Sequence, residues 1–301
     1  MLAGRCGRPL GLRGPALPLL EEMNPRSLRD ALQNILTPEE LAKVRAFDIV
    51  GDIGILRLPE ELLEKKHVIG EALLRVHRNL RTVLLQTSPV SGDYRTRKLE
   101  VVAGEPRTET IHREGGCLFK VDLSKVYFSP RLSFDRMRIA KQVKEGEVVT
   151  NLFAGVGCYS IIIAKQSKAS RVYSIDLNPD AYHYMCENVR LNRVGDRVIP
   201  ILGDAREKAP ALEKADRILM PLPERAREFL DTALAALKPN GVIHFYDFGT
   251  EPDPFTPSLR FLREKIGDIQ LLHARKLRSY APKCYHIVLD FSVPNVRNFA
   301  D

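Results

Sequence analysis

The chain has 301 residues, of which 44% are hydrophobic and 28% charged, and no run approaches the roughly 18 apolar residues of a membrane-spanning helix. This composition predicts a globular protein without a membrane contact, and five widely spaced cysteines predict neither a disulfide framework nor a metal site and favour the cytoplasm. Residues 1–144 hold 25 Lys+Arg against 18 Asp+Glu (net +7), whereas residues 145–301 hold 21 against 20 (net +1). A basic half beside a neutral half is typical of a polyanion-binding module joined to a catalytic domain, although a solvated surface without a partner has the same composition.

The first 25 residues are rich in Gly, Pro and Leu and predict a disordered extension. A transit peptide is one alternative, and a translation start at Met23 is another. Thr37-Pro38-Glu39-Glu40 combines an N-cap, a proline in the first turn and a capping-box glutamate, which predicts a helix from Thr37 to about Phe47.

Residues 26–125 are rich in β-branched residues and predict a small α+β module. The expected elements are a strand over 48–58, a helix over 59–78, and strands over 81–87, 98–103 and 108–123, the last broken by a turn at 114–116. Within this module, residues 93–98 (DYRTRK) predict a basic loop that contains a tyrosine.

Residues 126–301 have the pattern of an α/β domain. A helix over 132–143 is followed by strands that alternate with helices, which predicts a Rossmann-like parallel sheet covered by helices on both faces. The last two strands, within residues 276–293, are expected to close the sheet as an antiparallel edge.

The strongest local motif runs from Val149 to Gly157, where an apolar strand leads through a Gly-x-Gly turn into a helix. Gly155 and Gly157 permit a ligand to approach the backbone closely at the carboxyl end of the strand. Tight strand-to-helix turns also use glycine for structural reasons alone, so the motif by itself leaves both interpretations open.

Two acidic residues favour the interpretation as a ligand site. Asp176 ends the next strand and can accept hydrogen bonds from both ribose hydroxyls of a nucleoside, and Asp204 ends the third strand, where a carboxylate can hold an adenine amino group. Either acid alone is more often a helix cap or a turn residue, but the three strand ends together indicate a nucleoside cofactor. Ser160 stands where a NAD-binding motif has its third glycine, which favours S-adenosyl-L-methionine.

Several segments resemble the archaeal and eukaryotic tRNA methyltransferases that modify N1 of guanosine 37. They are spread over residues 45–293 and include PRLSFDRMRI, NLFAGVGCYSI, IDLNPDAY, RILMPLPERAREFLD and SYAP…HIVLDF. The resemblance implies a class I methyltransferase domain over 126–301, a tRNA-binding module over 26–125, and S-adenosyl-L-methionine as the cofactor. The implied partner is the anticodon stem-loop of tRNA, with no metal and no obligate protein partner. Many members of this family carry a further compact domain, for which the residues before Thr37 are expected to be too few.

The resemblance also implies catalytic roles. Methylation of guanine N1 needs a base for the N1 proton and a donor for the charge that gathers on O6. Asp135 stands where the family has a glutamate base, and Arg95 or Arg97 of the basic loop would contact O6. Phe119 and Tyr127 match positions near the target base, where an aromatic ring can stack on a flipped guanine, and ordinary packing is the competing interpretation for both.

The remaining site residues follow from the same segments. The expected cofactor contacts, beyond the two glycines and the two strand-end acids, are Arg136, Asn151, Phe153, Leu177 and Ala205. Pro223 is expected at the substrate. Pro221 is expected among the catalytic residues, where it replaces a family asparagine, so that side-chain amide is missing. The Asp135 side chain is one methylene shorter than the family's glutamate, so direct proton removal requires a shifted backbone or a bridging water.

Three further activities stay open on the sequence. A sister family transfers the aminocarboxypropyl group of the same cofactor during wybutosine synthesis, although PRLSFDRMRI and Leu222-Pro223-Glu224 favour the methyltransferase here. Some archaeal members of the methyltransferase family also methylate C7 of a wyosine precursor at the same nucleotide. The third is a non-catalytic RNA-binding protein with a degenerate pocket, against which the intact Asp176 and Asp204 argue.

Overall fold

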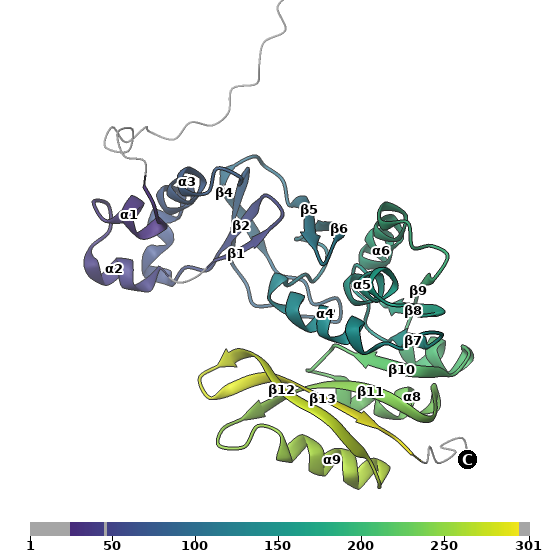
Figure 1. Cartoon of the computed structure of the whole chain (residues 1–301). Helices are drawn as coiled ribbons and strands as arrows, with labels where there is room; N and C mark the ends of the chain where they lie inside the picture. The colour runs from purple at the N-terminus through teal and green to yellow at the C-terminus, as the bar shows by residue number, and fades with distance from the viewer. Residues whose placement is uncertain (1–24, 45–46, 295–301) are drawn as a thin grey trace, which may run out of the picture.

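The computed structural model describes residues 25–44 and 47–294, in which a small N-terminal module is followed by a larger α/β domain (Figure 1). The extension expected over residues 1–25 lies, up to Asn24, outside the described part of the chain. Within the described residues, no helix is long and apolar enough to cross a membrane.

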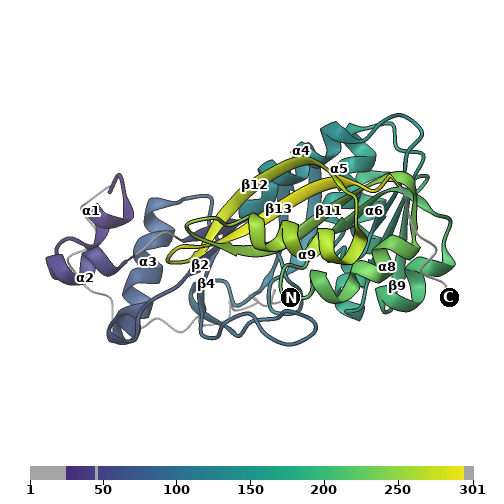
Figure 2. The same ribbon diagram turned by 90° about the horizontal axis from the view of Figure 1, so that it is seen from below.

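The N-terminal module is a four-stranded sheet with helices packed against it (Figures 1 and 2). The strands, in spatial order, are β1 (Asp48–Val50), β2 (Ile53–Leu56), β3 (Thr82–Gln86) and β4 (Leu99–Gly104). The helices are α1 (Leu28–Leu32), α2 (Pro38–Lys43), the 3-10 helix η2 (Glu60–Lys65) and α3 (Lys66–Val76). Leucine and isoleucine side chains from α1, α3 and the sheet form a separate core.

Helix α2 begins with the predicted capping box. Thr37 Oγ1 accepts a hydrogen bond from Glu40 N, and Glu40 Oε2 accepts one from Thr37 N, at 3.2 and 2.8 Å. The helix ends at Lys43, earlier than the expected Phe47, because Val44 has an extended backbone with ψ of 94°. The predicted strand over 48–58 is likewise divided, since Gly51 turns the chain at a φ of +56° between β1 and β2.

A two-stranded hairpin, β5 (Glu109–Glu114) and β6 (Cys117–Asp122), turns at the predicted glycine pair and packs on α6 (Pro179–Asn192). Two side chains of α6 bond the backbone of β6. Asn188 Oδ1 accepts from Lys120 N at 2.7 Å, and Asn192 Oδ1 accepts from Leu118 N at 2.8 Å. The hairpin is therefore tied to the α/β domain. The domain limits at residues 125 and 126 stay predictions.

The α/β domain has a seven-stranded sheet in the order β12-β13-β11-β10-β7-β8-β9. Its strands are β7 (Val148–Asn151), β8 (Arg171–Asp176), β9 (Val198–Leu202), β10 (Ala215–Met220), β11 (Leu237–Thr250), β12 (Gln270–Ala281) and β13 (Cys284–Ser292). Strands β7 to β11 are parallel, and β13 is antiparallel to both of its neighbours. The predicted parallel sheet with an antiparallel edge is confirmed.

Helices cover both faces of this sheet, so the strands bury residues on both sides. One face packs against α4 (Ser133–Gln142), α5 (Cys158–Gln166) and α6, which bury Val149, Val172 and Val198. The other face packs against α8 (Leu230–Ala235) and α9 (Thr256–Ile266). The short elements α7 (Ala205–Lys208), η3 (Pro130–Leu132), η4 (Ala209–Ala211) and η5 (Ala226–Phe229) complete the domain.

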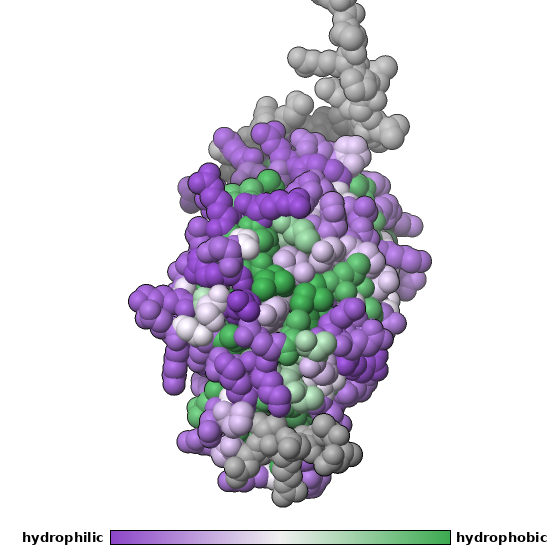
Figure 3. Space-filling view, turned by 90° about the vertical axis from the view of Figure 1, so that its right-hand side faces the viewer, coloured by the Kyte–Doolittle hydropathy of each residue, from purple (hydrophilic) through white to green (hydrophobic). Residues whose placement is uncertain are grey.

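Strand β9 forms one edge of the seven-stranded sheet, and β12 forms the other. Its Ile199 and Ile201 are half-buried and Leu202 is exposed. On the face that Figure 3 shows, which is the right-hand side of Figure 1, most of the surface is hydrophilic, and hydrophobic side chains form a band across its middle.

Candidate active site

A pocket lies at the carboxyl ends of β7, β8, β9 and β10, where three of the predicted motifs meet. The strand order reverses at β7, because β8 lies on one side of it and β10 on the other. Ligands of open α/β sheets bind at this kind of reversal. The wall of the pocket is built from Asp93, Tyr94, Arg95, Tyr127, Leu152, Phe153, Gly155, Asp176, Leu177, Asn178, Ala181, Gly203, Asp204, Ala205, Arg206, Pro221, Leu222, Arg225 and Phe229.

The two glycines after β7 differ in their roles. Gly155 lines the pocket with a φ of +57°, and a Cβ there would have only Tyr127 O within 4 Å, at 3.9 Å. Gly157, which is the N-cap of α5 with a φ of +89°, does not line the pocket. A Cβ on Gly157 would lie 3.0 Å from Ile161 and Met185, so this glycine serves the packing of the turn.

The two strand-end acids line the pocket but differ in their hydrogen-bond partners and in the direction of their pKa shifts. Asp176 Oδ2 accepts a hydrogen bond from Gly155 N at 2.6 Å, and Oδ1 accepts one from Asn178 N at 2.9 Å. Burial raises the pKa of Asp176, while these two amides act in the opposite direction. Asp204 caps α7 and pairs with Arg206 at 2.6 Å, and this pairing lowers the pKa of Asp204. Each oxygen of Asp176 keeps a lone pair for a further donor, whereas both oxygens of Asp204 are engaged by Arg206.

The other residues expected at the cofactor divide into two groups. Phe153, Leu177 and Ala205 line the pocket. Asn151 is fully buried beneath it, where its amide bonds Ser160 Oγ and Phe153 N at 3.3 Å and so shapes the turn. Arg136 does not line the pocket either.

The buried Arg136 guanidinium is instead engaged in a salt bridge to Glu114, with Arg136 Nη1 to Glu114 Oε2 at 2.5 Å. Its Nη2 also donates to Ser129 O at 2.7 Å. In this structure the charge is thus paired inside the protein, and the contact of Arg136 with the cofactor stays a prediction.

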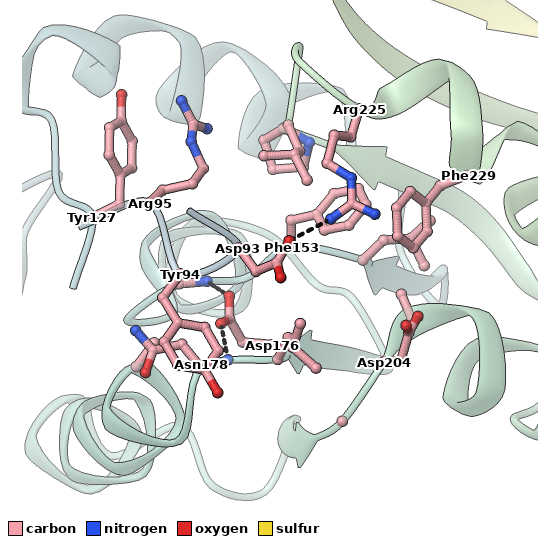
Figure 4. A pocket seen from close by; sticks show the side chains of 18 of the residues that line it. Asp93, Tyr94, Arg95, Tyr127, Phe153, Asp176, Asn178, Asp204, Arg225 and Phe229 are labelled. Carbon is pink, nitrogen blue, oxygen red and sulfur yellow. Dashed lines mark hydrogen bonds and ion pairs between the residues drawn. The ribbon is translucent and has the colours of Figure 1, made fainter. Parts of the chain in front are cut away.

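The basic loop of the N-terminal module reaches over the pocket (Figure 4). Asp93 pairs with Arg225 at 3.0 Å, and Arg95 pairs with Glu224 at 2.7 Å. The Arg95 guanidinium also lies 4.4 Å from the centre of the Tyr127 ring. Of the two candidate arginines, Arg95 therefore lines the pocket, whereas Arg97 turns back to Gln86 Oε1 at 3.4 Å. Burial and the neighbouring Arg57 lower the pKa of Arg97.

Asp135 lies on α4 and is buried, and it does not line the pocket. Its Oδ2 atom accepts hydrogen bonds from the hydroxyls of Tyr159 (2.7 Å) and Tyr246 (2.6 Å). Its Oδ1 atom accepts one from Arg138 Nε at 2.8 Å. Arg138 in turn pairs with the buried Asp290. The carboxylate is thus held by three donors, one of which comes from its own helix.

Only some of the residues expected at the substrate line the pocket. Tyr127 and Pro221 line the pocket, whereas Pro223 is buried just outside it. Phe119 on β6 is fully buried in the core, which agrees with the packing interpretation, and its contact with the target base stays a prediction. A phenyl ring without exposed surface cannot stack on a base in this conformation.

Several lining residues were not anticipated from the sequence. Asn178 and Arg206 each lie two residues after a strand-end acid, so their place after β8 and β9 was an available signal. No local sequence pattern indicated a role for Asp93, Arg225 and Phe229. The loop with Asp93 and the segment after β10 are far apart in the sequence, and they come together only in the folded structure.

Comparisons with known proteins identify the family to which the chain belongs. Residues 110–269 match the TRM5/TYW2 methyltransferase domain, and residues 28–108 match the TYW2 N-terminal domain. The tRNA (guanine(37)-N(1))-methyltransferase Trm5b of Pyrococcus abyssi is 47% identical over 89% of this chain and 81% of its own. The tRNA(Phe) (4-demethylwyosine(37)-C(7)) aminocarboxypropyltransferase of Methanocaldococcus jannaschii is 39% identical over 80% of this chain and 95% of its own.

Solved structures of related proteins share the fold. A complex of aTrm5 with tRNALeu superposes with a TM-score of 0.82 at 38% identity, over 90% of this chain and 79% of the other. The TYW2 of P. horikoshii in complex with MeSAdo gives a TM-score of 0.71 at 32% identity, over 89% and 98%. The predicted fold class, a Rossmann-like methyltransferase sheet with a small N-terminal module, and the predicted resemblance are confirmed. The chain belongs to the TRM5/TYW2 methyltransferase family.

Proposed function

We propose that this protein methylates N1 of guanosine 37 in tRNA, with S-adenosyl-L-methionine as the methyl donor. The observation that carries the proposal is the meeting of two sets of residues in one pocket. Gly155, Asp176 and Asp204 form the part suited to a nucleoside cofactor, and Arg95 and Tyr127 lie beside it. The methyltransferase relative that is 47% identical over most of the chain supports the same activity.

The pocket residues fit the cofactor. The Asp176 carboxylate suits the ribose hydroxyls, and the apolar Phe153 and Leu177 suit a flat base between them. Gly155 leaves open space where any other residue would place a Cβ. When bound, S-adenosyl-L-methionine supplies a methyl group activated by a sulfonium sulfur.

The chain's own residues orient the guanine and manage its charge and proton. As N1 loses its proton and gains the methyl group, negative charge gathers on O6, and the Arg95 guanidinium is the proposed donor to that atom. Asp135 is the proposed acceptor of the proton, and because its buried carboxylate does not line the pocket, the transfer requires the shifted backbone or the bridging water expected for its short side chain. Its Oδ1 atom accepts only one of the three hydrogen bonds, from Arg138, and so retains a lone pair.

A second candidate function is the transfer of the aminocarboxypropyl group of the same cofactor. The observation that favours it is the match of residues 28–108 to the TYW2 N-terminal domain. The transferase relative of M. jannaschii, 95% of whose length is covered, supports it too. The two reactions break different bonds of the same sulfonium, so the choice depends on which carbon faces the base.

One experiment separates these activities. The full chain is incubated with a tRNA transcript bearing G37, with cofactor labelled either in its methyl carbon or in its carboxyl carbon, and the nucleosides are analysed by mass spectrometry. The proposed function requires methyl label in 1-methylguanosine. A tRNA carrying 4-demethylwyosine, tested in parallel, reports methylation or aminocarboxypropyl transfer at C7.

The control for this experiment is Asp176→Ala, which is expected to lose the label because the cofactor is no longer held. Carboxyl label on either tRNA would assign the transferase instead. No label on either tRNA, with tRNA binding intact, would leave an RNA-binding protein.

A further inference from the structure

Three residues form a row across the antiparallel end of the catalytic sheet. Phe248 on β11 and Arg278 on β12 are both directly opposite His286 on β13 in the strand register. Residues opposite one another in adjacent strands point to the same face of the sheet. Tyr246, which bonds Asp135, belongs to the same face, with its ring 5.8 Å from that of His286. This row and Asp135 therefore share one side of the sheet.

His286 is buried, with 3% of its surface exposed, and neither of its ring nitrogens has a hydrogen-bond partner among residues 25–44 and 47–294. Arg278 Nε is also buried and has no hydrogen-bond partner within that part of the chain. A buried polar atom without a partner lowers the stability of the fold, and an apolar side chain at the same place would avoid that cost. Three such atoms on two opposed residues indicate a site that a ligand completes.

The pair lies at one end of the pocket. Arg278 Nη2 donates to the Tyr127 hydroxyl at 3.3 Å, and Tyr127 lines the pocket with Arg95 over its ring. Figure 4 shows Tyr127 and Arg95 on the side of the pocket away from Asp204. The Arg95 guanidinium lies over the face of the Tyr127 ring, and flat bases stack on aromatic faces of this kind.

The charges of the cluster favour an oxygen as the ligand atom. Burial, and then the charges of Arg278 and Arg95, lower the pKa of His286 to about 3, whereas the charge of Asp135 acts in the opposite direction. The imidazole is therefore neutral at pH 7 and keeps one N–H donor. A guanidinium and a neutral imidazole together present donors at fixed positions, which suit an oxygen that bears or gathers negative charge.

We propose that Arg278 and His286 bind an oxygen of the tRNA nucleotide that is to be modified, as a second donor site beside Arg95. The proposal rests on the proposed function for the identity of the RNA. It assigns to the β12–β13 hairpin a part in holding the target nucleotide. It also explains why both ring nitrogens of His286 and Nε of Arg278 are buried there without protein partners.

The test compares wild type with Arg278→Met, His286→Phe and His286→Gln in the full chain. Binding is measured to two tRNAs, one with G37 and one with 2-aminopurine at position 37, which lacks O6. Cofactor affinity, single-turnover transfer and thermal unfolding are measured on the same proteins. Arg275→Met and His273→Gln are the matched controls, because both side chains are exposed on the same strand β12.

We expect Arg278→Met and His286→Phe to weaken binding of the G37 tRNA by about 10- to 100-fold, the range of hydrogen bonds to charged groups. Cofactor affinity stays unchanged, and His286→Gln recovers part of the loss. A loss confined to the G37 tRNA identifies O6 as the bound oxygen. An equal loss on both tRNAs identifies a phosphate or sugar oxygen instead.

Unchanged tRNA binding and transfer in both variants would overturn the proposal. So would an equal loss in the two controls, or a loss that follows a fall in the unfolding temperature. Failure of the wild-type protein to transfer any group would refute the proposed function instead. The binding measurements on the two tRNAs would still decide the role of the pair.

Discussion

Arg95 and Arg97 are separated by one residue, yet only the first faces the pocket. Arg95 has a φ of +53°, a left-handed backbone that residues with a side chain rarely adopt. A strained conformation of this kind costs on the order of 1 kcal/mol and is often found at functional sites. Here it accompanies the placement of the guanidinium over Tyr127 and beside Glu224.

Replacement of the two arginines should therefore have unequal effects. Arg95→Met is expected to lower the single-turnover rate of methyl transfer by about 10²–10³-fold, because a donor aimed at developing charge is lost. Arg97→Met is the matched control and should leave the rate within about threefold of wild type. Both rates are measured with saturating tRNA and labelled cofactor. Equal losses, or a larger loss at Arg97, would contradict the assignment of Arg95.

Asp135 allows a similar prediction with a stricter control. If its carboxylate accepts the N1 proton, Asp135→Asn should cut the single-turnover rate by about 10²–10⁴-fold, the usual value of a positioned base, while both ligands bind normally. Asp135→Glu should retain or raise the rate, since it restores the longer side chain of the family. Rates and the unfolding temperature are measured together.

The contacts of Asp135 are also those of a purely structural residue, which is the alternative to its role as a base. Two tyrosine hydroxyls and Arg138 bond this buried carboxylate, so an amide in its place would disturb the contact between α4 and the sheet. Tyr246→Phe removes one donor and leaves the carboxylate in place, so it serves as the control. If Asp135→Asn lowers stability and ligand affinity but not the rate per bound complex, Asp135 is structural, and another group takes the proton.

At the scale of elements, local sequence patterns predicted the helix starts and turns that depend on neighbouring residues. The start of α2 followed from a capping box, and the break between β5 and β6 from a glycine pair. The alternation of strands and helices predicted the parallel sheet because each βαβ unit is built from neighbouring segments. Helix α1 was not predicted, since its five residues carry too short a periodic pattern.

The same distinction holds for the site. Gly155, Asp176 and Asp204 could be predicted because the carboxyl ends of parallel strands meet at one edge of the sheet. The contact of Asp93 with Arg225 could not, because it joins two loops from separate domains. His286 lies in a strand whose apolar pattern indicates only burial, so its unpartnered nitrogens appear only in three dimensions.

The basic surface of the N-terminal module gives a prediction at this scale. Arg75, Arg78 and Arg81 are exposed at the C-terminal end of α3 and just after it. If they bind tRNA phosphates, their replacement by glutamine should weaken binding and reduce the slope of log K against log salt by about 0.7–0.9 for each phosphate that is no longer neutralised. The slope is measured by titration at several salt concentrations.

Helix α9 offers the matched control for that triple variant. Its Arg260, Arg263 and Lys265 are equally exposed but belong to the catalytic domain. Their replacement should leave the slope as in wild type. If the α9 variant reduces the slope and the α3 variant does not, the tRNA lies across a different surface.

At the scale of the whole molecule, several buried polar groups lie together at the antiparallel end of the sheet. His244 bonds Asp290 at 2.7 Å, and Asp290 also pairs with Arg138, which reaches Asp135. Burial lowers the pKa of His244 and, together with nearby arginines, that of His286, so both rings are favoured in the neutral form inside the fold. In the unfolded chain each imidazole would bind a proton near pH 6.5.

These shifts predict how stability depends on pH. Because the folded-state pKa of His286 is depressed to about 3, the unfolded state binds more protons between about pH 3 and pH 6.5. The free energy of unfolding should therefore be highest above pH 6.5. It should fall as the pH is lowered, by up to about 1.4 kcal/mol per pH unit for each such histidine.

His286→Phe isolates the contribution of one ring, because phenylalanine fills the site without a titrating group or an unpartnered polar atom. The variant should be at least as stable as wild type at pH 7 and should lose stability less steeply between about pH 6 and pH 4, with His244 still contributing its part. Urea unfolding at a series of pH values measures both quantities, with the exposed His273→Gln as the control. A slope identical to wild type would mean that His286 finds a partner or water in solution that keeps its pKa near the unfolded value. The case for a ligand at Arg278 and His286 would then rest on the tRNA-binding measurements alone.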